Sequence, residues 1–176
     1  MVAQLPAISV NDDSSQKLPL TVGYFKDLCS RFMSEKSAKL AEKLTLEPPV
    51  EPVSTGSVFL DEWYAKERCL RLALAQIRAL KMKKDIKDLP SASDGESVQA
   101  ARTATGMDSP LAAEQYLNQY RLGILDRIAP MDSFSADAVY SYGLKLMLAE
   151  RMKKFNKDEG LASYHKIYDE ILGEKK

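Results

Sequence analysis

The segment that most constrains this fold is residues 57–84, which opens the longest stretch of the chain without proline or glycine and contains the only tryptophan. At about 100° per residue its apolar side chains fall on one side of a helix, a pattern typical of an amphipathic helix that faces a core. Ser57 precedes this run and is suited to cap it, because its hydroxyl can accept a hydrogen bond from an unpaired backbone amide of the first turn. The segment therefore predicts one long helix. Its core-facing residues are Phe59, Leu60, Trp63, Tyr64, Leu70, Leu74 and Ile77.

Helical patterns continue on both sides of this segment. Residues 21–44 have apolar residues at helical spacing and predict either two short helices or one bent helix. Residues 109–128 begin with a serine cap followed by proline, which favours the first helical position. Two more helices are expected over residues 135–155 and 156–172, the second with a single apolar stripe. The chain is therefore expected to be all-α, an irregular bundle of about five to six helices.

Two regions lack helical periodicity. Residues 1–20 contain two prolines and a polar run, and are expected to form an extended arm ahead of a single helical domain over residues 21–176. Residues 85–107 are rich in serine, alanine, threonine and glycine, which bury little surface against the entropy of ordering. We therefore expect a flexible loop at 85–107. It contains neither of the common glycine-rich phosphate-binding motifs.

Three charged residues interrupt the apolar faces of three different predicted helices: Glu67, Arg121 and Glu150. A buried charge without a partner costs several kcal/mol. The simplest interpretation is that these side chains satisfy one another where their helices pack, and we hypothesise such a structural charge cluster. The alternative is that part of the stripe around Glu67 contacts another protein. A catalytic role for Glu67 is disfavoured because no companion residues are apparent.

Composition argues against several classes of function. Lys and Arg total 25 and Asp and Glu also total 25, so no net charge attracts nucleic acid or anionic lipid. His165 is the only histidine, and Cys29 and Cys69 are too few for a structural zinc site. No GxSxG serine-nucleophile motif occurs. We therefore predict a non-enzyme with no metal or cofactor and no small-molecule substrate.

No apolar run reaches the roughly 20 residues that span a bilayer, so direct membrane insertion is not expected. The N-terminal residues lack the basic and apolar regions of a secretory signal. These features predict a soluble, cytoplasmic protein.

The long helical segment also carries a family resemblance. WYAKERCLRLALAQIRA (residues 63–79), SPLAAEQYL (109–117) and AVYSYGLKLMLAERMKKFNKDEG (138–160) resemble a small bacterial family of uncharacterised proteins associated with V-type ATPase subunits. The opening VAQLPAISV (2–10) and the stretch LPLTVGYFKDLCSRFMSEKSAKL (18–40) are also similar to that family. The resemblance therefore covers most of the chain, although its motifs are diffuse and non-catalytic.

That family is in turn faintly similar to the C subunit of the V-type ATPase, subunit d in eukaryotes. The C subunit is an all-helical socket that caps the membrane rotor ring and seats the central shaft. The residues that match its charged, aromatic and IRA-like pattern are Glu67, Arg68, Arg71, Ile77, Arg78 and Ala79. This chain is considerably shorter than a full C subunit, which puts the complete socket role in doubt.

The resemblance implies a non-catalytic subunit or accessory protein of a bacterial V-type ATPase. Its partners would be the central stalk and the rotor ring, and it would lie peripherally at the cytoplasmic face of the inner membrane. On this interpretation Trp63, Tyr64, Arg71 and Arg78 are the candidate interface residues. Two alternatives stay open: a helical protein-binding adaptor unrelated to the ATPase, and a bundle with a ligand pocket that the sequence does not reveal.

Overall fold

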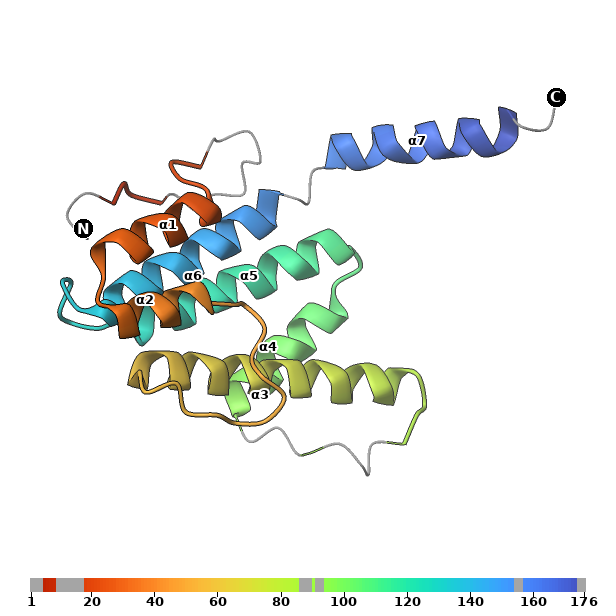
Figure 1. Ribbon diagram of the computed structural model, residues 1–176. Helices are drawn as coiled ribbons and strands as arrows, with labels where there is room; N and C mark the ends of the chain where they lie inside the picture. Colours follow the sequence, from red (N-terminus) through yellow and green to blue (C-terminus); the bar gives the residue numbers. More distant parts are fainter. Residues whose placement is uncertain (1–4, 9–17, 86–89, 91–93, 154–156, 174–176) are drawn as a thin grey trace.

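The computed structural model describes residues 5–8, 18–85, 90, 94–153 and 157–173, and within these ranges the chain folds into seven helices (Figure 1). The all-α prediction is confirmed, with one helix more than expected. The helices are α1 (Val22–Phe32), α2 (Glu35–Glu42), α3 (Val58–Lys81), α4 (Gly95–Gly106), α5 (Pro110–Arg127), α6 (Ala136–Lys153) and α7 (Lys157–Gly173).

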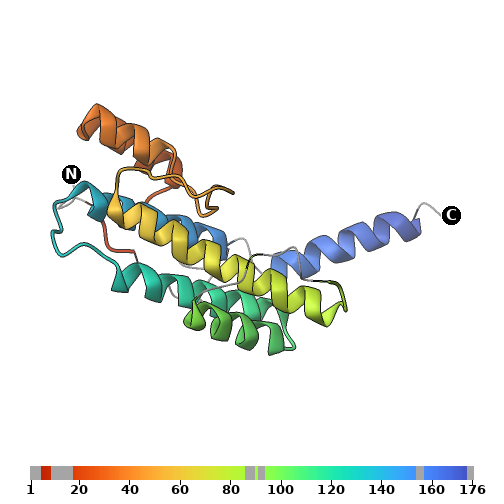
Figure 2. The same ribbon diagram turned by 90° about the horizontal axis from the view of Figure 1, so that it is seen from below.

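Helices α1–α6 form a packed body. Helix α5 packs against both α6 and α4, α3 packs against α4, α5 and α6, and α1 and α2 pack on each other and on α6 (Figures 1 and 2). The larger core gathers where α1, α2, α3, α5 and α6 meet, and both Trp63 and Phe25 are fully buried in it. A smaller core joins α4 to the neighbouring parts of α3 and α5, around Leu70, Ala101 and Leu117.

The expected N-caps are present. Ser57 accepts a hydrogen bond from the backbone amide of Leu60, and Ser109 accepts one from Ala112. The Ser57 hydroxyl also donates to Asp137 Oδ1 at 2.7 Å, which ties the start of α3 to the start of α6. The two-helix alternative holds for residues 21–44, because Met33 and Ser34 adopt non-helical backbone between α1 and α2.

A close approach of α1 to α6 depends on Gly143. A Cβ atom built at this position would lie 2.6 Å from Cε1 of Phe25 and 3.1 Å from Cδ1 of Leu44. Real Cβ contacts are not this short, and Phe25 is fully buried and has no room to withdraw. Glycine is therefore required for this packing.

The prediction of a loop at 85–107 is wrong for its second half. Residues 95–106 form α4, capped by the Asp94 side chain, which accepts a hydrogen bond from the amide of Ser97. The small residues Ala100, Ala101 and Ala104 are buried against α3 and α5. Small side chains bury little surface individually, but they let helix backbones approach closely, so the contact is made by helix-on-helix packing rather than by large residues. Residues 86–89 and 91–93 of the predicted loop lie outside the described residues.

The described parts of the N-terminal arm are non-helical and pack on the body. Leu5, Ile8, Leu18 and Leu20 are partly buried against the larger core. The Tyr142 hydroxyl donates to the carbonyl of Pro6 at 2.9 Å. The remainder of the predicted arm, residues 1–4 and 9–17, lies outside the described residues.

Helix α7 differs from the other helices in its surroundings. It lies apart from the body in both ribbon views (Figures 1 and 2). Every residue from 160 to 173 is exposed, including the apolar ones. Its amphipathic pattern is therefore not used to pack on the body.

Candidate functional site

The first candidate site is a pair of buried charges between α3 and α5. Glu67 is 1% exposed and Arg121 is 5% exposed. Arg121 donates from Nε to Glu67 Oε2 at 3.0 Å and from Nη2 to Glu67 Oε1 at 3.1 Å. This is the bidentate geometry of the strongest arginine–carboxylate pairs. The hypothesis that these two residues meet is therefore correct.

The pair is extended on both sides into a chain of alternating charges. On one side, Arg71 Nε donates to Glu67 Oε1 at 2.9 Å, and Arg71 Nη1 lies 3.8 Å from Glu47 Oε1. On the other side, Arg121 Nη1 lies 3.7 Å from Glu114 Oε1. Glu114 also pairs with Arg151 of α6. We call these six residues the charge network: Glu47, Glu67, Arg71, Glu114, Arg121 and Arg151.

The hypothesis was wrong for Glu150. In the described part of the chain the ion pairs of the network do not include Glu150, and its neighbour Arg151 makes the contact from α6 instead. Helix α6 is apolar on nearly all sides, so sequence spacing does not show which of its charged residues faces α5. Glu114 was missed, although it stands seven residues before Arg121 and so shares its face of α5.

The opposite charges of the network pair with one another, which leaves Glu67 little capacity to act on a substrate. The Glu67 carboxylate accepts three hydrogen bonds from guanidinium groups, two from Arg121 and one from Arg71. Arg121 has a further acceptor in Asn118 Oδ1 at 3.3 Å from its Nη1. Three of the roughly four lone-pair sites of the Glu67 carboxylate are therefore occupied, which makes it a poor general base. The arrangement orients α3, α5 and α6 relative to one another.

A second polar group surrounds the start of α4. The Ser97 hydroxyl is fully buried, donates to Asp94 Oδ2 at 2.5 Å and lies 3.3 Å from the Tyr120 hydroxyl. The hydrogen bonds from Ser97, with the nearby Lys66 ammonium, lower the pKa of Asp94 below its usual value. Burial raises the pKa of Tyr120. Each contact supports the cap of α4, so we interpret this group as structural.

The expected interface residues lie in different environments. Trp63 is fully buried and Tyr64 is 6% exposed, both in the larger core, so the prediction that they face a partner is wrong. Both belong to the apolar stripe by which α3 joins this core. Arg71 belongs to the charge network. Arg78 is exposed near the end of α3.

The cysteines and the histidine are also placed by the structure. Cys29 and Cys69 are not joined in a disulfide. Burial raises the pKa of the Cys29 thiol to about 11, so little of it is the reactive thiolate at neutral pH. His165 is exposed on α7, with its ring 5.7 Å from that of Tyr164.

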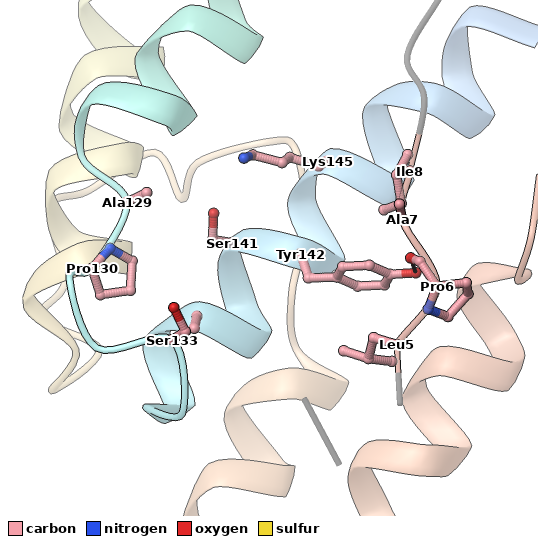
Figure 3. Close-up of a pocket in the computed structure, with 11 residues that line it drawn as sticks. Leu5, Pro6, Ala7, Ile8, Ala129, Pro130, Ser133, Ser141, Tyr142 and Lys145 are labelled. Carbon is pink, nitrogen blue, oxygen red and sulfur yellow. Dashed lines mark hydrogen bonds between the residues drawn. The ribbon is translucent and has the colours of Figure 1, made fainter. Parts of the chain in front are cut away.

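A shallow pocket of about 380 Å³ lies between the N-terminal segment 5–8, the loop after α5 and helix α6 (Figure 3). Two of its polar side chains are engaged within the chain. Tyr142 donates to the Pro6 carbonyl, and Lys145 Nζ lies 2.6 Å from Asp126 Oδ1. We interpret the pocket as the space left where the N-terminal segment packs beside α6 and the loop after α5.

Among the described residues, no group of three or more His, Cys, Asp or Glu side chains could hold a metal ion. None of the described helices combines the length and the apolar character that crossing a bilayer requires. Neither the protein-family models nor the curated proteins nor the solved structures gave a match to this chain.

Proposed function

We propose that this chain is a non-catalytic helical protein that works by binding other proteins, and that its partner is a bacterial V-type ATPase. It would act as a C-subunit-like subunit or accessory that helps to couple or assemble the central stalk and the membrane rotor. The proposal rests on residues 63–79, which carry the resemblance to the ATPase-associated family. Side chains in the C-terminal part of this segment are exposed to solvent.

The exposed part of this segment has a defined face. Ala75 and Arg78 lie within it and Met82 is the C-cap that follows α3; all three are exposed and follow one another at helical spacing. Met82 is 60% exposed, which leaves a flexible apolar side chain one turn from a guanidinium. Methionine and arginine are both enriched at protein interfaces. We call these three residues the α3 tip and propose that it contacts the pump.

The remainder of α3 supports this role by holding the tip rigid. The preceding turns are anchored by the buried Glu67–Arg121 pair and by Trp63. The Lys81 ammonium donates to the carbonyl of Thr105 at the end of α4, which attaches the last turn of α3 to its neighbour. Interfaces built on rigid elements lose less conformational entropy on binding.

Co-purification tests the proposal. Tagged chain, expressed in cells that contain a V-type ATPase and extracted in mild detergent, is expected to recover stalk or rotor subunits. Arg78→Glu is expected to reduce that recovery at least about tenfold, because reversal of an interface charge opposes docking. The matched control is Arg102→Glu on the exposed side of α4, which makes the same charge change and should leave recovery unaltered. Wild-type chain that recovers no ATPase subunit would reject the pump as partner.

The alternative is a helical adaptor unrelated to the ATPase. The exposed apolar stripe of α7 favours a protein-binding role without indicating the pump. The same experiment separates the two, since an adaptor would recover a reproducible set of partners that contains no ATPase subunit.

A further inference from the structure

Helix α7 exposes a continuous apolar stripe. Six large apolar side chains between residues 161 and 172 are each 49–63% exposed. Tyr164 and Tyr168 stack on each other with their ring centroids 6.0 Å apart. Isolated helices of about this length are marginally stable in water, so a partner that covers the stripe would stabilise the helix. The stripe consists of Leu161, Tyr164, Ile167, Tyr168, Ile171 and Leu172.

The spacing within the stripe is that of a helix-pairing seam. Leu161, Tyr164, Tyr168 and Ile171 are separated by three, four and three residues, which matches alternating a and d positions over two heptads. At about 100° per residue, Lys166, Asp169 and Glu170 fall away from this seam. A helix that covers the seam would therefore desolvate none of these charged side chains.

The seam is also nearly symmetric about its midpoint. When two copies of α7 are laid antiparallel with Lys166 opposite Lys166, Leu161 faces the partner's Ile171 and Tyr164 faces the partner's Tyr168. Aliphatic residues then meet aliphatic residues, and aromatic residues meet aromatic residues. A two-fold interface requires this self-complementarity, because the same patch must fit itself. We propose that α7 pairs antiparallel with α7 of a second copy of this chain, which makes the protein a homodimer.

Two further considerations favour the antiparallel orientation. Three residues, 154–156, separate α6 from α7, so the body stays close to the start of α7. A parallel pair would crowd two bodies at the same end, whereas an antiparallel pair separates them by the length of the helix, about 25 Å. Antiparallel packing also places the positive end of each helix dipole beside the negative end of the other.

The area available predicts a weak dimer. Covering six large, half-exposed side chains on each of two helices would remove roughly 1,000–1,500 Å² from solvent, at the lower end of the range for stable protein interfaces. We therefore expect a dissociation constant on the order of 1–100 µM.

The first test is the mass of the purified chain by sedimentation equilibrium from about 1 to 200 µM, a range that brackets the expected dissociation constant. Wild type is expected to pass from monomer to dimer. Leu161→Asp with Ile171→Asp is expected to remain monomeric, because it places charges in the seam. Ala162→Asp with Ser163→Asp adds the same two charges away from the seam and should dimerise as wild type does. The fluorescence of the buried Trp63 reports whether each variant keeps its folded body.

The second test measures orientation by disulfide cross-linking. An equimolar mixture of Leu161→Cys and Ile171→Cys chains is expected to form the mixed disulfide at least about tenfold faster than either chain forms its own, because only the mixed pair is brought together. Wild type under the same oxidant gives the background from Cys29 and Cys69.

Wild type that stays monomeric at the highest concentration, equal dimerisation of the two double-Asp variants, or faster same-site disulfides would overturn the proposal. If wild type is monomeric alone but the seam variant loses ATPase subunits in co-purification, then the stripe binds the pump instead of a second copy. Because these measurements use the purified chain alone, they do not depend on whether the pump is the partner.

Discussion

The charge network and helix α7 reverse the usual distribution of polar and apolar groups. In the body, Glu67 and Arg121 lie where hydrophobic residues are expected, at 1% and 5% exposed. On α7, six large apolar side chains lie where polar residues are expected. Both regions belong to amphipathic helices, and both deviate from a simple pattern of apolar interior and polar surface.

The difference shows what helical periodicity can and cannot reveal. A charge within an apolar stripe indicates that another charge must approach it, because it would otherwise be buried without a partner. An apolar stripe without charges carries no such requirement, since its periodicity alone does not distinguish a neighbouring helix of the same chain from a second copy or another protein. The apolar periodicity of α3 therefore predicted that Glu67 contacts an opposite charge on another helix. The periodicity of α7 predicted only that some partner covers its apolar stripe.

The largest effect is expected from Glu67→Ala. This change leaves Arg121 buried without its carboxylate and should lower the free energy of unfolding by about 3–5 kcal/mol. Urea denaturation followed by Trp63 fluorescence measures the loss. Glu35→Ala removes the exposed Glu35–Lys39 pair and serves as the control, for which we expect a change near the error of the measurement. A loss below about 1 kcal/mol for Glu67→Ala would show that the buried pair does not hold the body together.

A double-mutant cycle measures the interaction between Glu67 and Arg121 directly. Glu67→Gln and Arg121→Met, made singly and together, should be non-additive by about 1–3 kcal/mol because the two side chains share hydrogen bonds. Strictly additive changes would contradict the contact.

Matched glycines compare the packing of the two regions. Gly143→Ala places a methyl group 2.6 Å from the buried Phe25 ring, and should destabilise the body by about 1–3 kcal/mol. Gly160→Ala in α7 meets nothing within 4 Å, and should instead increase the helical content seen by circular dichroism, since alanine favours helix by about 1 kcal/mol. A similar response at both positions would mean that α7 is packed as tightly as the body.

Much of the fold could be predicted from the sequence, and the exceptions share a physical cause. The long helices α3, α5 and α6 follow from apolar periodicity and serine caps, and the Glu67–Arg121 contact follows from one charge on each of two stripes. Helix α4 was missed because its buried apolar residues are alanines, which contribute to packing only when a neighbouring backbone comes close. The one sequence feature that indicates the start of α4 is Asp94, an acidic N-cap residue three positions before Ser97.

The candidate site was less predictable, because periodicity places a residue on a face without identifying what covers that face. Trp63 and Tyr64 are large and aromatic, which suits an interface as well as a core, and the structure buries both. Glu150 and Arg151 are adjacent on a helix that is covered on several sides, so only the packed structure distinguishes which one meets α5.

A smaller effect is expected from acidification. The pKa of Asp94 is lowered in the folded state, chiefly by its hydrogen bond from Ser97, so its contribution is complete above the unfolded value of about 3.9 and is lost as the pH falls through the folded value. When the pH falls from 6 to 3, the free energy of unfolding should decrease in both proteins. The decrease should be smaller by about 0.5–1 kcal/mol in Asp94→Asn, because asparagine still caps the helix but does not titrate. Urea denaturation at both pH values measures this difference, and parallel losses in the two proteins would exclude Asp94 as a source of the acid sensitivity.

The smallest effect is expected from removal of α7. A chain that ends at Lys153 should unfold at low protein concentration with a free energy within about 0.5 kcal/mol of wild type, because residues 160–173 are exposed and contribute little burial. The helical circular-dichroism signal should fall by less than the share of helical residues that α7 contributes, because an uncovered helix frays. At concentrations above the dimer dissociation constant the comparison should change, since wild type then gains stability by mass action and the shortened chain does not. A cost of several kcal/mol at low concentration would instead mean that α7 packs on its own body, and the contrast between a self-sufficient body and an unpartnered helix would not hold.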